Sequence, residues 1–183
     1  MHEPLTISAS HHSPDLLVRP RSYWTQGPMG YQLRLAEANC MSIADLSRIG
    51  IRYDPECFAR QRLLPEYALY PEVHDHVARM SGFLKDKPRI WNHHQARFCP
   101  ECLTVLPFWL ATWEIYFYDV CHFHGVWLVD RCSSCGNPIH WNRPSLLRCQ
   151  CGSDLTQEKT ELAHRSLWRL SMWLSAKLIK EEV

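Results

Sequence analysis

Four pairs of metal-ligand residues follow one another in the second half of this chain, and they constrain its fold more than any other feature. The pairs are Cys99-Pro-Glu-Cys102, Cys121-His-Phe-His124, Cys132-Ser-Ser-Cys135 and Cys149-Gln-Cys151. Two ligands separated by two residues can turn toward one ion, and a second pair brought back by a short loop completes a tetrahedron. The eight ligands therefore predict two metal sites, each with four protein ligands.

The eight ligands can be shared between two ions in two ways. In a cross-braced arrangement the first and third pairs bind one ion. In a consecutive arrangement the first two pairs bind one ion and the last two bind the other, and we favour it because the cost of closing a loop rises with its length. The first site is then Cys99, Cys102, Cys121 and His124, and the second is Cys132, Cys135, Cys149 and Cys151. His122 is a spare imidazole, but it adjoins Cys121, so we expect His124 to be the ligand.

Two structural zinc ions are the cofactors that these ligands predict. A catalytic zinc keeps one position open for water or substrate, whereas all four positions are filled here, so we expect no enzymatic activity. Disulfides are the alternative in a secreted chain, but residues 1–15 contain no apolar core of the kind that a signal peptide requires, and we expect a cytoplasmic protein. A redox dithiol is a second alternative for Cys-x-x-Cys, although the Cys-x-x-His and Cys-x-Cys pairs fit it poorly.

Charge is distributed unevenly over the 183 residues. Residues 16–97 contain twelve Lys and Arg against eight Asp and Glu, whereas residues 98–156 contain three against five. The first half is therefore basic, but its net positive charge is smaller than that of most DNA-binding domains. No apolar run approaches the ~18 residues of a bilayer-spanning helix, so we expect no membrane partner.

The first half of the chain has the pattern of short helices that follow a flexible arm at residues 1–15. Pro28 suits a first helical turn, and Tyr31, Leu35 and Ala38 then share one face. Further helical patterns begin at prolines in residues 55–64 and 71–80, and a polar connector places a domain boundary near residues 82–97. The two cysteines outside the ligand pairs are expected to be buried thiols; they are Cys40 and Cys57.

A second short helix is expected directly after the first. Ser42 is a suitable N-cap, and Asp45 lies near the helix N-terminus. Two helices joined by a tight turn predict a helix-turn-helix, although any helical hairpin has the same pattern. The exposed candidates for contact with base edges are Asp45, Ser47, Arg48 and Arg52, a set with few of the residues that read bases.

The segments around the ligand pairs are rich in aromatic and apolar residues. Residues 106–118 carry more rings than one zinc knuckle can bury, so we expect them to pack into a core shared with the helical unit, and base stacking is the alternative. Residues 125–130 predict a strand, and residues 138–143 predict the return arm of a hairpin. Residues 157–180 predict a long helix that packs on the body or on a partner; its stripe is Leu167, Leu170, Leu174 and Leu178, with Trp168 and Trp173 beside it.

These motifs together resemble the TniQ family of transposon target-selection proteins. The resemblance lies in Arg97-Phe-Cys-Pro-Glu-Cys102, Val120-Cys-His-Phe-His-Gly125, Leu128-Val-Asp-Arg-Cys-Ser-Ser-Cys-Gly136, Cys149-Gln-Cys-Gly-Ser-Asp-Leu155 and the Gly-Tyr-Gln-Leu-Arg-Leu-Ala-Glu-Ala-Asn segment that starts at Gly30. It implies a mainly α fold with small zinc-stabilised α/β elements. The implied parts are a flexible arm (1–15), a helix-turn-helix domain (16–90), a tandem zinc-finger domain (91–156) and a C-terminal helix (157–183).

The resemblance also implies a role without catalysis in bacterial DNA transposition. Members of the family recruit the AAA+ ATPase TnsC; some bind an attachment site through long C-terminal regions, others work with a CRISPR effector complex and its guide RNA, and some form dimers. The sequence stops soon after the second finger, which favours an adaptor over a DNA-binding selector of sites. We expect protein contacts at Leu17, Tyr23 and Trp24, and contacts with target DNA or other nucleic acid at Arg19, Arg21, Arg34, Arg48 and Arg52.

Overall fold

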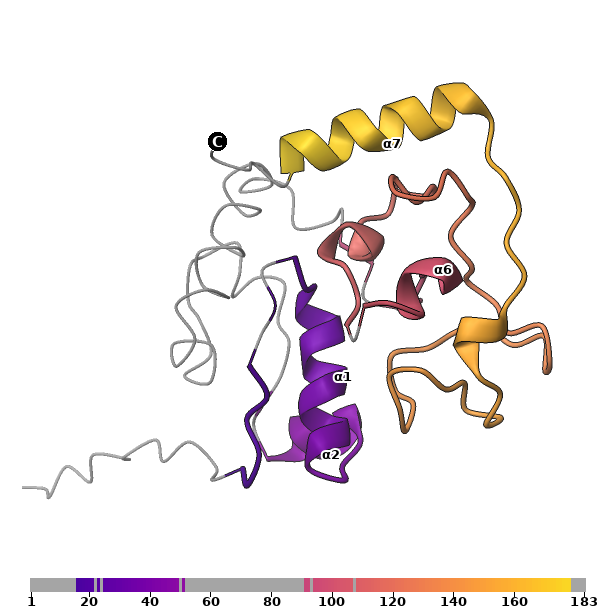
Figure 1. The fold of residues 1–183 in the computed structure, drawn as a ribbon. Helices are drawn as coiled ribbons and strands as arrows, with labels where there is room; N and C mark the ends of the chain where they lie inside the picture. The colour runs from indigo at the N-terminus through magenta and orange to yellow at the C-terminus, as the bar shows by residue number, and fades with distance from the viewer. Residues whose placement is uncertain are drawn as a thin grey trace, which may run out of the picture.

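The computed structural model describes residues 16–21, 23, 25–49, 51, 91–92, 94–106 and 108–178. Its α-helices are α1 (Pro28–Ala38), α2 (Ile43–Arg48), α6 (Pro100–Leu103) and α7 (Arg165–Leu178), and its 3₁₀ helices are η2 (Ala111–Glu114) and η3 (Leu155–Gln157) (Figure 1). The extended segments within these ranges pair only through isolated β-bridges. None of the described helices is both long and apolar enough to cross a membrane. The predicted arm at 1–15, the predicted helices at 55–64 and 71–80, and Cys57 lie outside the described residues.

The helices α1 and α2 form the helical hairpin that the first half of the sequence predicts. Pro28 occupies the first turn of α1, and Ser42 caps α2 in a reciprocal capping box with Asp45. The hydroxyl of Ser42 accepts from the backbone N–H of Asp45 at 3.1 Å, and the carboxylate of Asp45 accepts from the N–H of Ser42 at 3.0 Å. The prediction for Cys40 is wrong: the residue lies in the turn between the helices at φ 56°, and its side chain is exposed.

One aromatic core joins α1 to the segments that carry the ligand pairs. Met29 and Leu33 of α1 belong to the same buried cluster as the rings of residues 98–141. Trp109 lies at its centre, with ring centroids 5.0 Å from Phe98, 5.8 Å from Trp113 and 5.2 Å from Trp141. The prediction of a shared core is therefore confirmed, with the exception of two exposed rings, Tyr116 and Phe117. The opposite face of α1 packs against α2 in a smaller cluster of Tyr31, Leu35, Ala36, Leu46 and Ile51.

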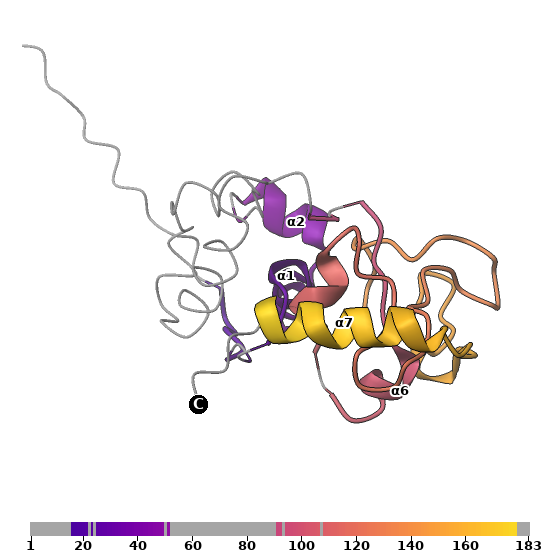
Figure 2. The ribbon, with the colours of Figure 1, turned by 90° about the horizontal axis from the view of Figure 1, so that it is seen from above.

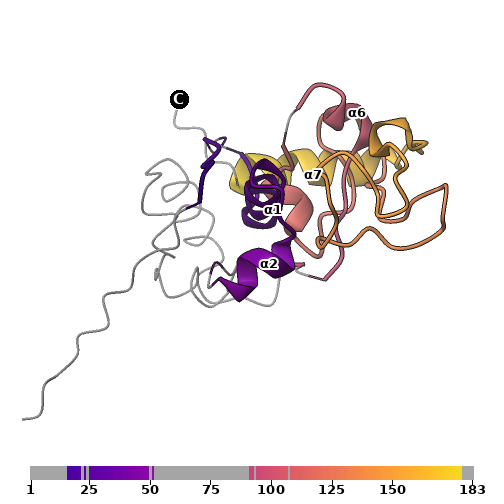
Figure 3. The same cartoon turned by 90° about the horizontal axis from the view of Figure 1, so that it is seen from below.

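Carboxylates attach both ends of α1 to the second half of the chain. At the N-terminus, the buried carboxylate of Glu114 accepts from the backbone N–H groups of Met29 at 3.1 Å and Gly30 at 2.9 Å. At the C-terminal end, the carboxylate of Glu37 accepts from the hydroxyl of Ser145 at 2.9 Å and from the N–H of Leu146 at 3.0 Å. In Figure 3, α1 is seen end-on beside the segment that carries η2. The first helix is thus held as part of the same body as the ligand pairs.

The C-terminal helix begins later than the sequence predicts. Residues 155–157 form η3, and α7 starts only at Arg165. The intervening segment is extended because it pairs with the residues that follow the second ligand pair. The backbone N–H of Trp127 donates to the carbonyl of Glu161, and the N–H of Ala163 donates to the carbonyl of Gly125, both at 2.9 Å. The predicted strand at 125–130 and the hairpin arm at 138–143 are also reduced to isolated bridges, which include Val126 with Leu162 and Arg131 with Pro138.

Candidate metal centres

The first two ligand pairs converge on one cluster. Its members are Cys99, Cys102, Cys121 and His124, and their ligand atoms lie within 4.8 Å of one another. The Nδ1 atom of His124 lies 3.4 Å, 3.3 Å and 3.6 Å from the sulfurs of Cys99, Cys102 and Cys121, and the sulfurs of Cys102 and Cys121 are 3.6 Å apart. The three cysteines are buried and the histidine is half-buried. His124, and not His122, is thus the histidine that joins the cluster.

The last two pairs converge on a second cluster of Cys132, Cys135, Cys149 and Cys151. Sulfur separations are 3.7 Å between Cys132 and Cys151 and 3.8 Å between Cys135 and Cys149. This cluster is nearer to solvent than the first, since Cys151 is exposed and Cys135 is half-buried. The eight residues are thus grouped as in the consecutive arrangement, the first pair with the second and the third with the fourth.

The separations in both clusters fit a metal ion and exclude disulfides. With metal–sulfur bonds of ~2.3 Å, the sulfurs of a regular tetrahedron lie ~3.8 Å apart. A disulfide requires ~2.05 Å, and all eight cysteines that the structure describes are free. Either cluster could therefore hold one ion with four protein ligands.

Tight backbone turns bring the two ligands of a pair together. After Cys121-His-Phe-His124, the N–H of Gly125 donates to the carbonyl of Cys121 at 2.9 Å; after the third pair, the N–H of Gly136 donates to the carbonyl of Cys132 at 2.8 Å. Both glycines have a left-handed backbone, with φ 66° and 70°, which a residue with a Cβ adopts only with strain. The first pair closes differently, because Pro100 starts α6 and the N–H of Leu103 donates to the carbonyl of Cys99.

Aromatic groups hold the ligand turn of the first cluster in place. The indole N–H of Trp168 in α7 donates to the carbonyl of His122 at 2.8 Å. The Trp168 ring also lies against Gly125, where a Cβ would come within 3.0 Å of it. On the other side, the hydroxyl of Tyr118 lies 2.5 Å from Nδ1 of His122. The spare histidine thus supports the turn rather than the ion.

The thiols of the first cluster are too close to be ionised together in the absence of a cation. The hydrogen bond between Cys102 and Cys121 raises the pKa of Cys102 and lowers the pKa of Cys121 to about 2. Cys121 is therefore the thiolate, and it accepts hydrogen bonds from the neighbouring thiols. A divalent cation offsets the repulsion between neighbouring thiolates, so that all the thiols can be ionised together.

A buried arginine compensates for the negative charge of the second cluster. Arg143 is only 2% exposed and lines a hollow beside the sulfurs of Cys135, Cys149 and Cys151. Its guanidinium donates to three backbone carbonyls, those of His140 at 2.7 Å, Ser145 at 3.1 Å and Leu146 at 3.4 Å, and lies 4.4 Å from the centroid of the Trp109 ring. Burial lowers the pKa of Arg143 to about 9, while the charge of Cys149 acts in the opposite direction. Four thiolates around a divalent ion carry a net charge of about −2, which this cation offsets.

Two further polar groups support the second cluster. The hydroxyl of Ser153 lies 2.9 Å from the sulfur of Cys132 and 3.3 Å from that of Cys151. The carboxylate of Glu158 accepts from the N–H of Ser133 at 3.0 Å and 3.1 Å and so holds the third ligand turn. Sequence reasoning missed Glu37, Glu114, Arg143, Ser153 and Glu158 because their partners are distant in the chain or are backbone groups. The one clear signal in the sequence was Glu114, a carboxylate inside the otherwise apolar segment of residues 106–118.

The other predicted site residues lie in the segment before α1 and in the helical hairpin. Leu17 is 97% exposed, while the N–H and carbonyl of its neighbour Val18 are hydrogen bonded to the side chain of Asn39 at 3.0 Å and 2.7 Å. Tyr23 stacks on Phe108, with ring centroids 4.4 Å apart. Trp24 and Arg52 lie outside the described residues.

Among the predicted nucleic-acid contacts, Arg34 is engaged within the chain. Its guanidinium lies 4.6 Å from the centroid of the Tyr23 ring and donates to the side chain of Gln26 at 2.7 Å and to the carbonyl of Arg21 at 3.2 Å. Arg48 is exposed and forms an ion pair with Asp45. Arg21 is exposed and Arg19 is half-buried. Contact of these arginines with nucleic acid stays a prediction.

Comparison with known proteins does not assign the chain to a family. No protein-family model matches the chain, and no curated protein is significantly similar to it in sequence.

Proposed function

We propose that the protein is a non-catalytic adaptor in DNA transposition, built around two structural zinc ions. In this role it links a target-recognition complex, a CRISPR effector with its guide RNA, to the AAA+ ATPase TnsC and so to the transposase. The observation that carries the proposal is the order of the four ligand pairs with their flanking residues, preceded by the segment from Gly30 to Asn39. Target DNA and a second copy of the chain are further partners in the proposal.

The donor sets support zinc as the metal. Thiolate and imidazole ligands at tetrahedral separations favour zinc over magnesium or calcium, which prefer oxygen ligands. Each cluster offers four protein ligands and so reserves no position for substrate. The free energy of zinc binding then contributes to folding, as it does in small zinc-dependent domains.

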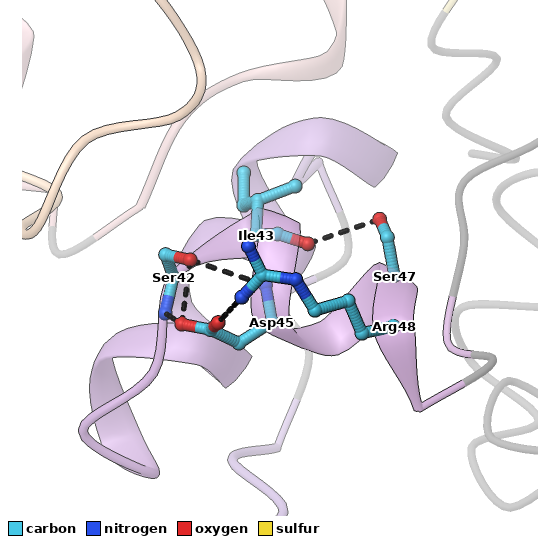
Figure 4. A network of polar contacts seen from close by, with 5 residues as sticks. All are labelled: Ser42, Ile43, Asp45, Ser47 and Arg48. Carbon is cyan, nitrogen blue, oxygen red and sulfur yellow. Dashed lines mark hydrogen bonds and ion pairs between the residues drawn. The ribbon is translucent and has the colours of Figure 1, made fainter.

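The polar groups of α2 favour an adaptor over a protein that selects DNA sequences by itself. In a DNA-reading helix-turn-helix, side chains near the start of the second helix contact base edges. Here Asp45 places a carboxylate at that position, caps the helix and pairs with Arg48, while the hydroxyl of Ser47 donates to the carbonyl of Ile43 at 3.0 Å (Figure 4). Negative charge at this end would repel DNA phosphates, and the neighbouring polar groups are engaged within their own helix.

The experiment that tests the proposal is co-sedimentation of the zinc-loaded protein with the TnsC ATPase of the same transposon, assembled on DNA with nucleotide, across a salt series. We expect binding that survives moderate salt, because apolar contacts made by Leu17 and its neighbours are less sensitive to screening than contacts with phosphate. Leu17→Ser should reduce the bound fraction. Val105→Ser is the matched control, since Val105 is also a strongly exposed apolar residue but lies beside α6.

Failure to co-sediment, together with sequence-selective affinity for a duplex, would contradict this function and make the protein a DNA-binding site selector. Equal loss of binding in Leu17→Ser and Val105→Ser would instead contradict the placement of the interface at Leu17.

A further inference from the structure

Among the residues that the structure describes, the helix α7 leaves two leucines of its apolar stripe, Leu167 and Leu170, exposed. It rests on the body through Trp168, Ser171 and Ser175, which follow one another at spacings of three and four; Trp168 is partly buried and both serines are buried. The leucines lie to one side of this contact. Leu167 is 37% exposed and Leu170 is 49% exposed, whereas Leu174 is half-buried and packs against the main core cluster. In Figure 2, seen from above, α7 lies in front of the molecule and no described segment crosses it.

Positive charge borders this stripe along the outer face of α7. Arg169, Trp173 and Lys177 are all exposed and lie four residues apart, so they form one line along the helix. Trp173 is 56% exposed. The fourteen residues of α7 contain two arginines and one lysine but no aspartate or glutamate. The exposed surface therefore combines an apolar stripe with an adjoining cationic line.

From this arrangement we infer that α7 is the docking surface for an amphipathic helix of a partner protein whose apolar side is bordered by carboxylates. The leucines of the partner pack on Leu167 and Leu170, as in helix-in-groove recognition. Its carboxylates face Arg169 and Lys177, and the Trp173 ring packs at the border between the two zones. This inference goes beyond the adaptor function and does not depend on it.

The same surface fits other occupants less well. A helix that lies in a bilayer interface needs cationic groups on both sides of its apolar stripe, whereas the other side of this stripe is the buried face with Ser171 and Ser175. A second copy would bring three more cations and no carboxylate from α7. Duplex DNA would pair with the cations but would leave the leucines against phosphate and water.

Fluorescence anisotropy of the full-length, zinc-loaded protein tests the inference. The probe is a labelled synthetic peptide with leucines in a heptad pattern and glutamates on both sides of them, and a peptide of the same composition in scrambled order is its control. We expect Leu170→Gln combined with Trp173→Gln to weaken binding about tenfold or more, because two apolar anchors are lost. Arg169→Gln combined with Lys177→Gln should weaken binding and reduce its salt dependence.

Matched variants outside α7 should bind the peptide like the unmodified protein. They are Val105→Ser, an exposed apolar residue, and Lys159→Gln, an exposed cation; zinc content and circular dichroism verify the fold of each variant. Absence of binding, equal binding of the scrambled peptide, or equal affinity in all variants would overturn the inference. Binding of a duplex or of anionic phospholipid vesicles that is lost in the α7 variants, without peptide binding, would assign the surface to that other partner and overturn it as well.

Discussion

At the scale of single residues, the eight ligands are the part of the site that local sequence predicts best. Pair spacing and the glycines after the pairs are local properties, and they place both ligands of a pair on one side of a turn. The supporting residues could not be predicted in the same way. Arg143 is buried against three nearby backbone carbonyls and against the ring of Trp109, which only the folded chain brings to it. An arginine in a loop is otherwise an ordinary surface residue.

We predict that Cys132→Ser reduces the zinc content from two ions per chain to about one and unfolds the second cluster, because three ligands no longer close a structural site. Zinc analysis and circular dichroism measure both effects. Cys40→Ser is the control, since Cys40 is exposed and lies outside both clusters. A folded Cys132→Ser variant that keeps two ions would show that Cys132 is not a ligand.

Arg143→Gln is expected to destabilise the protein by about 2–4 kcal/mol, because buried carbonyls lose charge-assisted donors and the thiolate cluster loses a nearby cation. Thermal or denaturant unfolding of the zinc-loaded protein measures this change. Arg48→Ala removes an exposed ion pair and should change the stability by less than about 1 kcal/mol. Comparable losses in the two variants would mean that Arg143 does not support the cluster.

At the scale of elements, α1 and α2 follow from local signals, while the start of α7 does not. Pro28 and the Ser42 cap determine where the first helices begin. Residues 158–164 have no local signal against helix, but their hydrogen bonds to residues 125–127 hold them extended. The cap of α1 could not be predicted from local sequence either, because it is the carboxylate of Glu114, 85 residues away from Met29 in the chain. Gly27, the N-cap, has no side chain to do so, and a Cβ there would lie 2.0 Å from Oε1 of Glu114.

Glu114 gives a pH-dependent prediction for the attachment of α1. Burial raises the pKa of Glu114 to about 8 from its usual 4.5, against the effect of the two N–H donors. The folded state therefore binds more protons than the unfolded state between these values, so the contribution of Glu114 to stability is largest below pH 4.5 and falls as pH rises toward 8.

The measurement is chemical denaturation of the unmodified protein and Glu114→Gln at several pH values from neutral to mildly alkaline. The difference in unfolding free energy should shift against the unmodified protein by up to ~1.4 kcal/mol per pH unit, and level off above the folded-state pKa. Protonation of zinc ligands affects both proteins and cancels in the difference. Parallel pH profiles would show that Glu114 does not titrate in this range.

At the scale of the whole molecule, the helical hairpin and the two Cys/His clusters pack into one body. Met29 and Leu33 share a core with the ligand-bearing segments, and Glu37 and Glu114 attach both ends of α1 to them. The sequence suggests a boundary near residues 82–97, but the contacts of α1 depend on residues about a hundred positions away, which no local pattern reveals. The helix α1 is therefore part of the same core as the segments that carry the two Cys/His clusters.

Removal of zinc should accordingly expose α1 as well as the ligand loops. We predict that a chelator increases hydrogen exchange in α1 together with residues 98–156. Without metal, the ligand-bearing segments that form one side of the shared core lose their order. Mass spectrometry of peptic fragments resolves the two regions. Protection of α1 that persists after complete loss of metal would mean that the hairpin folds independently.

Native mass spectrometry of the intact protein, purified without added metal, tests the central claim most directly. Two consecutive sites predict a single species with two zinc ions per chain, and denaturation should release both ions and leave every cysteine as a free thiol. A chain without metal, one zinc ion per chain, the mass of an iron–sulfur cluster, or the loss of hydrogen pairs that marks disulfides would contradict it.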